Sequence, residues 1–297
     1  MSVILLIGGL LLFCFCLTFR TVLLHPFSFV FYAFKDLFLY FKHHDYDLCP
    51  TGKLNEYDAH FGGGKTMSAV HDVSSLYYRY NNKKVWDRDQ KRFVIQKIHV
   101  ISNVDFLSFS SDKLESLAQV TNLTLKYKNI DKENGTRTVI ILMLDEASVQ
   151  LNSRNFKTNI SADFLNSLLC SRHYNMNIYI TSQKFRLVDA LMRSVTQICI
   201  SCHKVWRIMI NTYYNADEIE YASNPTLVKP ICRKAWFIKD KDYNAYDTLA
   251  VVDNLKKSVD EGDMLSEAEI LALRGVINPD NDAVTSPSRK LRRMRKK

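Results

Sequence analysis

Several classes of protein are excluded by what this sequence lacks, beginning with a cysteine framework. Its seven cysteines offer one CxxC spacing, Cys199 to Cys202, with no second CxxC and no histidine partner at zinc-finger distance. Ile198 and Val205 flank the pair in an apolar, strand-like run, so we interpret both cysteines as buried free thiols. An odd cysteine count without a framework is typical of a reducing cytosol.

Charge is absent from residues 2–19, an apolar stretch of 18 residues that is long enough to span a bilayer. No basic residue precedes it, whereas Arg20, Lys35 and Lys42 follow it, which is the reverse of a cleaved signal peptide. We therefore predict an uncleaved transmembrane helix, with the body of the chain in the cytoplasm by the positive-inside rule. The apolar run at residues 21–34 is compatible with an interfacial segment or a second pass.

The excess of positive charge lies at one end of the chain. The net charge is +9, and residues 289–297 carry seven positive charges, which leaves 9 − 7 = +2 for the rest. Such a tail would attract phosphate backbones independently of base sequence. It would equally attract an anionic membrane surface, or serve only to keep the chain soluble.

The sequence pattern divides the chain into four parts. We predict a membrane anchor and juxtamembrane segment at 1–45, a folded domain at 46–245, a helical extension at 246–277 and a disordered basic tail at 278–297. Within the folded domain, strand-like runs alternate with helical patterns, which predicts an α/β fold with a mainly parallel sheet and helices on both faces. The strand-like runs are 92–102, 139–144, 177–181 and 197–205, with edge strands expected at 208–214 and 235–239, and the helical patterns are 67–78, 112–121, 162–170 and 188–195. Residues 129–137 are polar and predict a loop.

A phosphate-binding motif occupies residues 59–66, AHFGGGKT, which matches the Walker A pattern with Ala59 in place of the first glycine. Successive glycines let backbone N–H groups turn toward the β- and γ-phosphates of a nucleotide, and the following helix directs its amino end at the anion. Lys65 would reach the phosphate oxygens and Thr66 would ligate Mg²⁺. The predicted nucleotide-binding residues are Gly62, Gly63, Gly64, Lys65, Thr66 and Met67. Residues 53–58 are more polar than is usual for the buried strand before such a loop.

A second motif follows 80 residues after the first, where the apolar run 139–144 ends in Asp145 and Glu146. This is the Walker B pattern, in which a buried strand delivers Asp145 to the Mg²⁺ shell and Glu146 acts as general base toward water. The two motifs in this order predict a P-loop NTPase that uses ATP and Mg²⁺. ATP is preferred to GTP because the chain lacks the guanine-specifying Asn-Lys-x-Asp sequence.

Other polar residues follow strands of the predicted sheet. Asn103 ends the run 92–102 and Gln183 follows the run 177–181, so both should face the nucleotide crevice at the carboxyl ends of parallel strands. Gln183 is a candidate sensor of the γ-phosphate or the attacking water, with a solvated loop amide as the alternative. Arg172 is a candidate arginine finger toward a neighbouring subunit, with a surface ion pair as the alternative.

The series of motifs resembles that of the zonula occludens toxin-like ATPases, the assembly ATPases of filamentous phages within the FtsK–HerA group. The resemblance spans about residues 57–205 and rests on GGGKT at 62–66, ISN at 101–103, LMLDEA at 142–147, SRHYNMNIYITSQ at 171–183 and DALMRS at 189–194. It implies a homo-oligomeric ring, an additional strand between the P-loop and Walker B strands, and single- or double-stranded DNA as cargo. Two departures are Ala59 and the membrane span, which precedes the ATPase domain here and commonly follows it in that family. A membrane-bound genome-packaging ATPase of another small phage is equally compatible.

We therefore predict an ATP hydrolase, anchored by a single pass in the host inner membrane, that translocates phage DNA during virion assembly, extrusion or genome packaging. Phage assembly or capsid proteins would be its partners. A helicase-like ATPase is one alternative, because residues 145–148 read DEAS, although no HRxGR motif is present. A nucleotide-binding membrane scaffold without hydrolysis is another. A ParA-type partition ATPase is disfavoured because Phe61 stands where that family has lysine.

Overall fold

The computed structural model describes residues 16–114, 117–147 and 168–247 of the chain. Most of the predicted membrane span, the greater part of the helical pattern at 162–170, nearly all of the helical extension and the basic tail lie outside the described residues. The boundaries of the predicted domains are therefore not tested.

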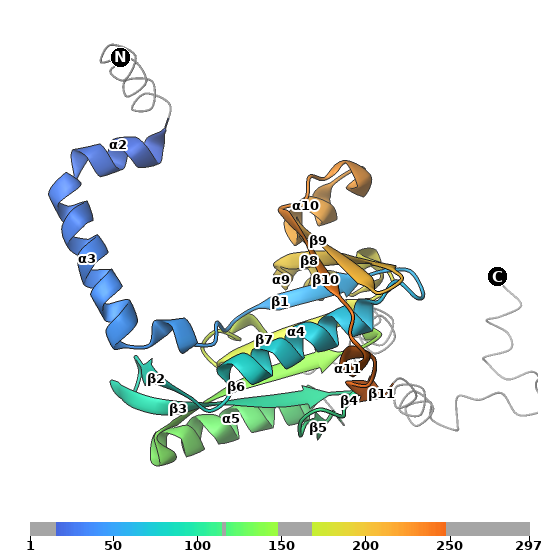
Figure 1. The fold of residues 1–297 in the computed structure, drawn as a ribbon, viewed down its shortest axis with the longest axis horizontal. Coiled ribbons are helices and arrows are strands. Elements are labelled where there is room, and N and C mark those ends of the chain that lie inside the picture. Colours follow the sequence, from blue (N-terminus) through green and yellow to red (C-terminus); the bar gives the residue numbers. More distant parts are fainter. Residues whose placement is uncertain (1–15, 115–116, 148–167, 248–297) are drawn as a thin grey trace, which may run out of the picture. The chain divides into compact units, whose positions relative to one another are not determined.

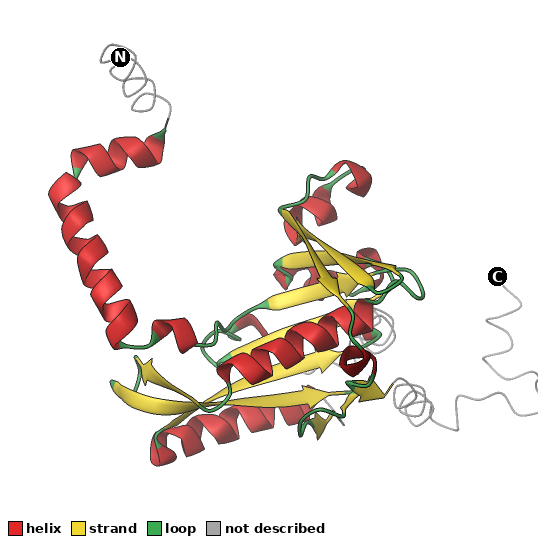
Figure 2. Cartoon of the chain, viewed as in Figure 1, coloured by secondary structure: helices red, strands yellow, loops and turns green. Residues whose placement is uncertain are grey.

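Helices separate short runs of strands along the described part of the chain (Figures 1 and 2). The strands are β1 (Leu54–Asp58), β2 (Lys83–Asp87), β3 (Arg92–Ser102), β4 (Asp105–Phe106), β5 (Asp112–Lys113), β6 (Thr136–Leu144), β7 (Met176–Ser182), β8 (Ile198–Val205), β9 (Ile208–Asn215), β10 (Cys232–Phe237) and β11 (Tyr246–Asp247). The helices are α2 (Leu17–Leu24), α3 (Pro26–Lys42), α4 (Lys65–Tyr80), α5 (Leu117–Asn134), α9 (Ala190–Val195), α10 (Ala216–Tyr221) and α11 (Asp240–Tyr243), with 3₁₀ turns η1 (Asp45–Asp47), η2 (Phe185–Leu187) and η3 (Pro225–Leu227).

One sheet forms the centre of the fold, with the strand order β10-β9-β8-β1-β7-β6-β3-β2 and β5 paired to β3. The strands from β8 to β3 in this order are mutually parallel, while β9, β10 and β2 pair antiparallel at the two sides. Strand β7 lies between β1 and β6, which confirms the additional strand implied by the sequence resemblance. This order brings the carboxyl ends of β1, β7, β6 and β3 to one edge of the sheet (Figure 1).

Both faces of the parallel strands are covered, as predicted. Along β6 the alternate residues Ile140, Leu142 and Leu144 pack with Val120 of α5 in one core cluster. The residues between them point to the opposite face and are equally buried. That opposite face carries α4, since the Tyr57 hydroxyl on β1 donates to Asp72 on α4 over 2.6 Å. A sheet buried on both sides explains why β6 is a continuous apolar run.

The prediction of a loop at 129–137 was wrong. Helix α5 continues to Asn134 and β6 begins at Thr136, so a single glycine separates them. Asp131 makes this junction possible, because its buried carboxylate accepts hydrogen bonds from the hydroxyls of Thr136 and Thr138 and from the Thr138 amide. At this junction a local polar network, rather than apolar periodicity, determines where the helix ends and the strand begins.

Strand β1 is central despite its polar sequence, and polar partners on both neighbouring strands account for this. Glu56 is fully buried and accepts a 2.5 Å hydrogen bond from the Ser182 hydroxyl on β7, while Asp58 accepts from Ser201 on β8. Burial raises the pKa of Glu56 to about 8, although the Ser182 hydrogen bond opposes the shift. A protonated Glu56 carries no charge, so this position is compatible with the interior of the sheet.

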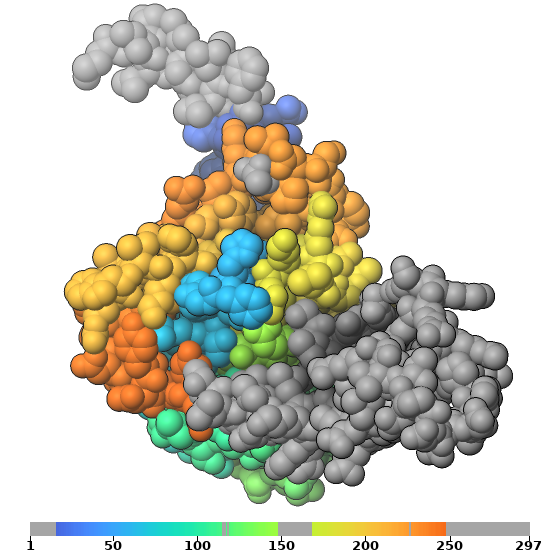
Figure 3. Space-filling view, turned by 90° about the vertical axis from the view of Figure 1, so that its right-hand side faces the viewer, coloured from blue at the N-terminus to red at the C-terminus, as the bar shows by residue number. Residues whose placement is uncertain are grey.

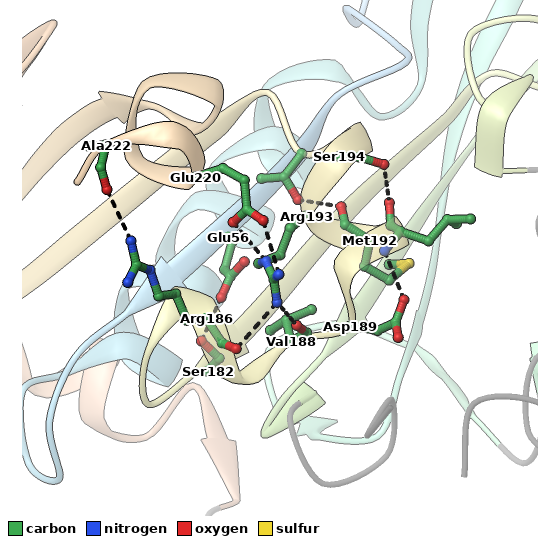
Figure 4. A network of polar contacts seen from close by, with 12 residues as sticks. Glu56, Ser182, Arg186, Val188, Asp189, Met192, Arg193, Ser194, Glu220 and Ala222 are labelled. Atoms are coloured by element: carbon green, nitrogen blue, oxygen red, sulfur yellow. Dashed lines mark hydrogen bonds and ion pairs between the residues drawn. The ribbon is translucent and has the colours of Figure 1, made fainter. Parts of the chain in front are cut away.

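An arginine lies next to this buried carboxyl group (Figure 4). The Arg193 guanidinium on α9 donates to both carboxylate oxygens of Glu220 on α10, at 2.8 and 2.9 Å. It also donates to the backbone oxygens of Val188 and Arg186, at 2.5 and 3.2 Å. The positive charge of Arg193 is thus already neutralised, which is why burial outweighs its effect on the pKa of Glu56.

The apolar segment before the domain forms two helices. No single helix in the described residues is long and apolar enough to cross a membrane, but α2 and α3 meet that criterion together as a pair bent by 96°. The bend lies at His25, immediately before Pro26.

We expect Glu56 to make the folded state less stable as pH rises from about 5 to about 8. Below its ordinary pKa of 4.5 the carboxyl group is protonated in both states, whereas between 4.5 and about 8 only the folded state keeps the proton. Each pH unit in that window removes about 1.4 kcal/mol from the free energy of unfolding. Glu56→Gln should flatten the dependence of the melting temperature on pH, measured by circular dichroism. Glu133→Gln, which changes an exposed carboxylate, should leave the slope as it is; a native slope in Glu56→Gln would contradict the assignment.

Candidate nucleotide site

The loop between β1 and α4 has the conformation that a phosphate-binding loop requires. Gly64 takes a φ of 88°, and a Cβ there would lie 2.2 Å from Cε of Met209. Gly63 is equally constrained, because a Cβ would lie 2.6 Å from that of Ala59. Glycine is therefore the residue that fits at both positions without strain or collision. Gly62 also has a positive φ, of 76°, and the α4 amino terminus follows directly at Lys65.

The two predicted motifs meet at the carboxyl edge of the sheet. The Thr66 hydroxyl donates to Oδ1 of Asp145 over 2.7 Å, and Nζ of Lys65 lies 2.7 Å from Oε1 of Glu146. These contacts join the first turn of α4 to the end of β6, residues separated by 79 positions in sequence. The structure therefore brings together Lys65, Thr66, Asp145 and Glu146, as the sequence predicted.

Side chains of two neighbouring strands hold Asp145 in place. The Asn103 amide after β3 donates to the Asp145 backbone oxygen at 2.9 Å and accepts from its backbone N–H at 2.8 Å. From β7, the Thr181 hydroxyl donates to the Asp145 carboxylate at 2.6 Å and accepts from the Glu146 N–H at 3.0 Å. Asn103 was expected to face the crevice, whereas sequence reasoning missed Thr181. The signal for Thr181 was its position two residues before Gln183, on the same face of the strand.

Backbone strain and burial distinguish the two acidic residues. Glu146 has a φ of 51°, a left-handed conformation that costs a non-glycine residue about 1–3 kcal/mol. The bonds to Lys65 and Thr181 hold it there. Burial raises the pKa of Asp145, while the hydrogen bonds from Thr181 and Thr66 and the charge of Lys65 act in the opposite direction. Glu146 Oε2 is buried and has no hydrogen-bond donor among the described residues.

These residues fit a nucleotide with Mg²⁺. The Thr66 hydroxyl and the Asp145 carboxylate already lie in contact, and hard oxygen donors of this kind are what Mg²⁺ prefers. The positive φ of Gly62 and Gly64 gives the loop a backbone conformation in which successive N–H groups can turn toward a phosphate. Met67 is buried in the first turn of α4, so its backbone rather than its side chain is available to a ligand.

The remaining predicted residues lie at opposite ends of β7. Gln183 follows the strand directly and is half-buried at the same edge as the glycine loop. In Figure 3 the atoms of the glycine loop, of the end of β6 and of the segment after β7 (light blue, green and yellow) gather on one face. Arg172 precedes β7. The seven residues of this strand, at about 3.3 Å each, separate Arg172 by about 20 Å from the edge of the sheet that carries the glycine loop. The structure therefore does not bring Arg172 to this chain's own nucleotide site. That Arg172 acts as an arginine finger toward a neighbouring subunit stays a prediction.

Thr181→Val should weaken Mg²⁺-dependent binding of a fluorescent ATP analogue while leaving Mg²⁺-independent binding through Lys65 near native. The substitution keeps the shape of the side chain but removes both bonds that fix Asp145 and Glu146, each worth about 1–3 kcal/mol. The measurement is a Mg²⁺ titration at constant analogue concentration, where the half-saturating Mg²⁺ concentration should rise about tenfold or more. Thr124→Val removes a buried hydroxyl from α5, away from this edge, and should behave as native. Equal curves for Thr181→Val and the native chain would contradict the positioning role.

No protein-family model and no curated protein matches the sequence. Solved structures similar to the chain include the N-terminal domain of zonular occludens toxin from Neisseria meningitidis, at 14% identity and a TM-score of 0.43, covering 67% of this chain and 100% of that one. The genome packaging NTPase B204 of Sulfolobus turreted icosahedral virus 2, in complex with ATP-γ-S, aligns at 10% identity and a TM-score of 0.39, over 63% of this chain and 98% of its own. EssC (ATPases 2 and 3) of Geobacillus thermodenitrificans aligns at 12% identity and a TM-score of 0.35, over 69% and 43%. The family that the sequence resembles is thus represented among the structures similar to this chain.

Proposed function

We propose that this chain is an ATP hydrolase, anchored in the host inner membrane, that couples hydrolysis to the translocation of phage DNA. The observation that carries the hydrolase assignment is the pairing of Lys65 with Glu146 and of Thr66 with Asp145, which assembles both motifs at one edge of the sheet. The strand order supports it, because β7 presents Gln183 between the glycine loop and the two acids.

Each side chain has a separate task in this proposal. Lys65 would bind the β- and γ-phosphate oxygens, while Thr66 and Asp145 would hold Mg²⁺, whose charge offsets that of the phosphates. Glu146 would accept the proton of the attacking water, and Gln183 would orient that water.

The ion pair between Lys65 and Glu146 gives these tasks an order. An ammonium that binds phosphate oxygens must give up part of its interaction with Oε1 of Glu146. Oε2 is buried and has no donor in the described part of the chain, so Oε1 is the oxygen that Lys65 would release toward water. Binding of the phosphates through Lys65 would therefore prepare Glu146 to act as base, and hydrolysis would follow binding.

The DNA, ring and membrane parts of the proposal rest on other features. The seven positive charges in residues 289–297 would contact phosphate backbones without reading sequence. Residues 2–19 would anchor the chain, with the body in the cytoplasm. The resemblance to zonula occludens toxin-like ATPases suggests a homo-oligomeric ring, with Arg172 acting on the neighbouring subunit, and phage assembly or capsid proteins as partners.

ATP hydrolysis by the full-length chain in detergent, with and without single- and double-stranded DNA, tests the proposal. We expect turnover that DNA stimulates. Lys65→Ala should abolish nucleotide binding and turnover together. Lys132→Ala, which changes an exposed lysine on α5, is the matched control and should keep native turnover. Turnover that is absent, or that persists in Lys65→Ala, would overturn the hydrolase assignment, whereas turnover indifferent to DNA would overturn only the motor.

Glu146→Gln should separate binding from chemistry. The amide cannot accept the proton, so turnover should fall by about 10²–10⁴-fold. It also no longer competes for Lys65 as a charged partner, so the Kd for ATP should be equal to or below the native value. Isothermal titration and a phosphate-release assay on the same sample measure the two quantities. Weaker binding with native turnover would show that Glu146 is structural and would favour a different base.

The scaffold alternative has lost its main support. It rested on the polar sequence of residues 53–58, which the bonds of Glu56 and Asp58 to neighbouring strands now explain. No residue described in the structure specifically favours a helicase.

A further inference from the structure

Helix α3 presents a large apolar surface that the described part of the chain leaves uncovered. It has no buried residue along its 17 positions. Its aromatic side chains are highly exposed, with Phe27 at 89%, Phe34 at 71% and Phe38 at 65%. Exposure on this scale is a mark of an interaction surface rather than of a free surface helix.

Two lysines and a serine of α3 share a narrow strip of its surface. At about 100° per residue, apolar side chains occupy most of the circumference of α3, and six of them share an arc of about 100°. This arc contains Phe27, Val30, Phe34, Leu37, Phe38 and Phe41. Ser28, Lys35 and Lys42 recur at a spacing of seven residues and so lie along one line, roughly 110° from the centre of that arc, with the apolar Phe31 and Leu39 on either side of it. The helix is therefore apolar over most of its surface, with an aromatic side centred on this arc and one narrow cationic strip.

The length and the charges of α3 argue against a second crossing of the bilayer. Seventeen residues rise about 25 Å, less than the hydrocarbon core of about 30 Å. Lys35 and Asp36 lie close to the middle of the helix, where a crossing would bury them at the greatest depth.

The bend before α3 gives its direction. Helix α2 includes the last three residues of the charge-free segment 2–19, and α3 leaves α2 at 96°. If α2 ends a crossing of the bilayer, a turn close to a right angle places α3 along the membrane plane. At the other end of α3, His43 stacks on Trp86 of β2 with 4.7 Å between ring centroids and 7° between planes, and accepts a backbone hydrogen bond from it. The start of the folded domain is thus fixed to the end of this helix.

We propose that α3 lies in the plane of the membrane at the lipid–water boundary, with its aromatic side in the acyl chains and the line of Ser28, Lys35 and Lys42 toward the headgroups. Amphipathic helices with phenylalanine on one side and lysine on the other bind such interfaces, and aromatic rings concentrate there. Continuity with residues 2–19 identifies the bilayer, rather than a second copy of the chain, as the occupant of the apolar side. The inference deepens the proposed function and rests on its membrane anchor.

Nitroxide depth measurements on the full-length chain in phospholipid vesicles test the proposal. Cysteines 14, 16, 170 and 232 are replaced by serine, while the thiols of Cys49, Cys199 and Cys202 stay because they are buried. Single labels are then placed through Val30→Cys, Leu37→Cys and Phe41→Cys on the apolar side, and Ser28→Cys, Lys35→Cys and Lys42→Cys on the polar side. Accessibility to oxygen, which concentrates in lipid, and to a water-soluble nickel complex gives the depth of each label.

The three apolar-side labels should share one depth below the phosphates, and the three polar-side labels should share a shallower one. A depth that is greatest at Lys35 and Leu37 and small at both ends, whichever side carries the label, would show a second crossing. Nickel accessibility at all six positions would place α3 in water, and exclusion of both reagents would show that protein covers it. Each of these three results overturns the proposal.

ATP turnover of the same labelled samples separates this inference from the proposed function. Turnover with the wrong depth pattern would overturn only the placement of α3. The expected depth pattern without turnover would contradict the hydrolase and leave the membrane placement standing.

Discussion

The site depends on how the Asp145 carboxyl group is held. It receives hydrogen bonds from Thr66 on α4 and Thr181 on β7. The side chain of Asn103, after β3, forms hydrogen bonds with both the backbone N–H and the backbone oxygen of Asp145. Three separate elements therefore converge on the end of β6, through residues that lie 36, 42 and 79 positions from Asp145 in sequence. The parallel order of β1, β7, β6 and β3 is what makes this convergence possible, because it places their carboxyl ends together.

The sequence predicted most of this arrangement because the chemistry is local. Phosphate binding needs glycines followed by Lys65 and Thr66, and a metal-binding acid needs an apolar strand before it. Each motif can therefore be recognised from a short stretch of sequence. The predicted strands at 92–102, 139–144, 177–181 and 197–205 correspond to β3, β6, β7 and β8. Cys199 and Cys202 are buried free thiols, as interpreted.

What the sequence could not predict depends on contacts between distant residues. The polar residues of β1 looked unsuited to a buried strand because Ser182 and Ser201, their partners, lie more than a hundred positions away. The prediction of a loop at 129–137 was wrong for a related reason. The Asp131 carboxylate accepts hydrogen bonds from residues at the start of β6, so that helix α5 is followed almost directly by a strand. Thr181 went unrecognised because a threonine within a strand is ordinary until its neighbours are known. In each case a hydrogen bond, rather than burial of apolar surface, decided the outcome.

The position of β7 has a mechanical consequence. It shares a ladder of backbone hydrogen bonds with β1 on one side and with β6 on the other. A displacement of β1 relative to β6 would have to break at least one of these ladders, so the strands beneath the site form a rigid unit. Any movement during a reaction cycle is then expected in the segments attached to the ends of these strands. The sheet is the fixed reference relative to which they move.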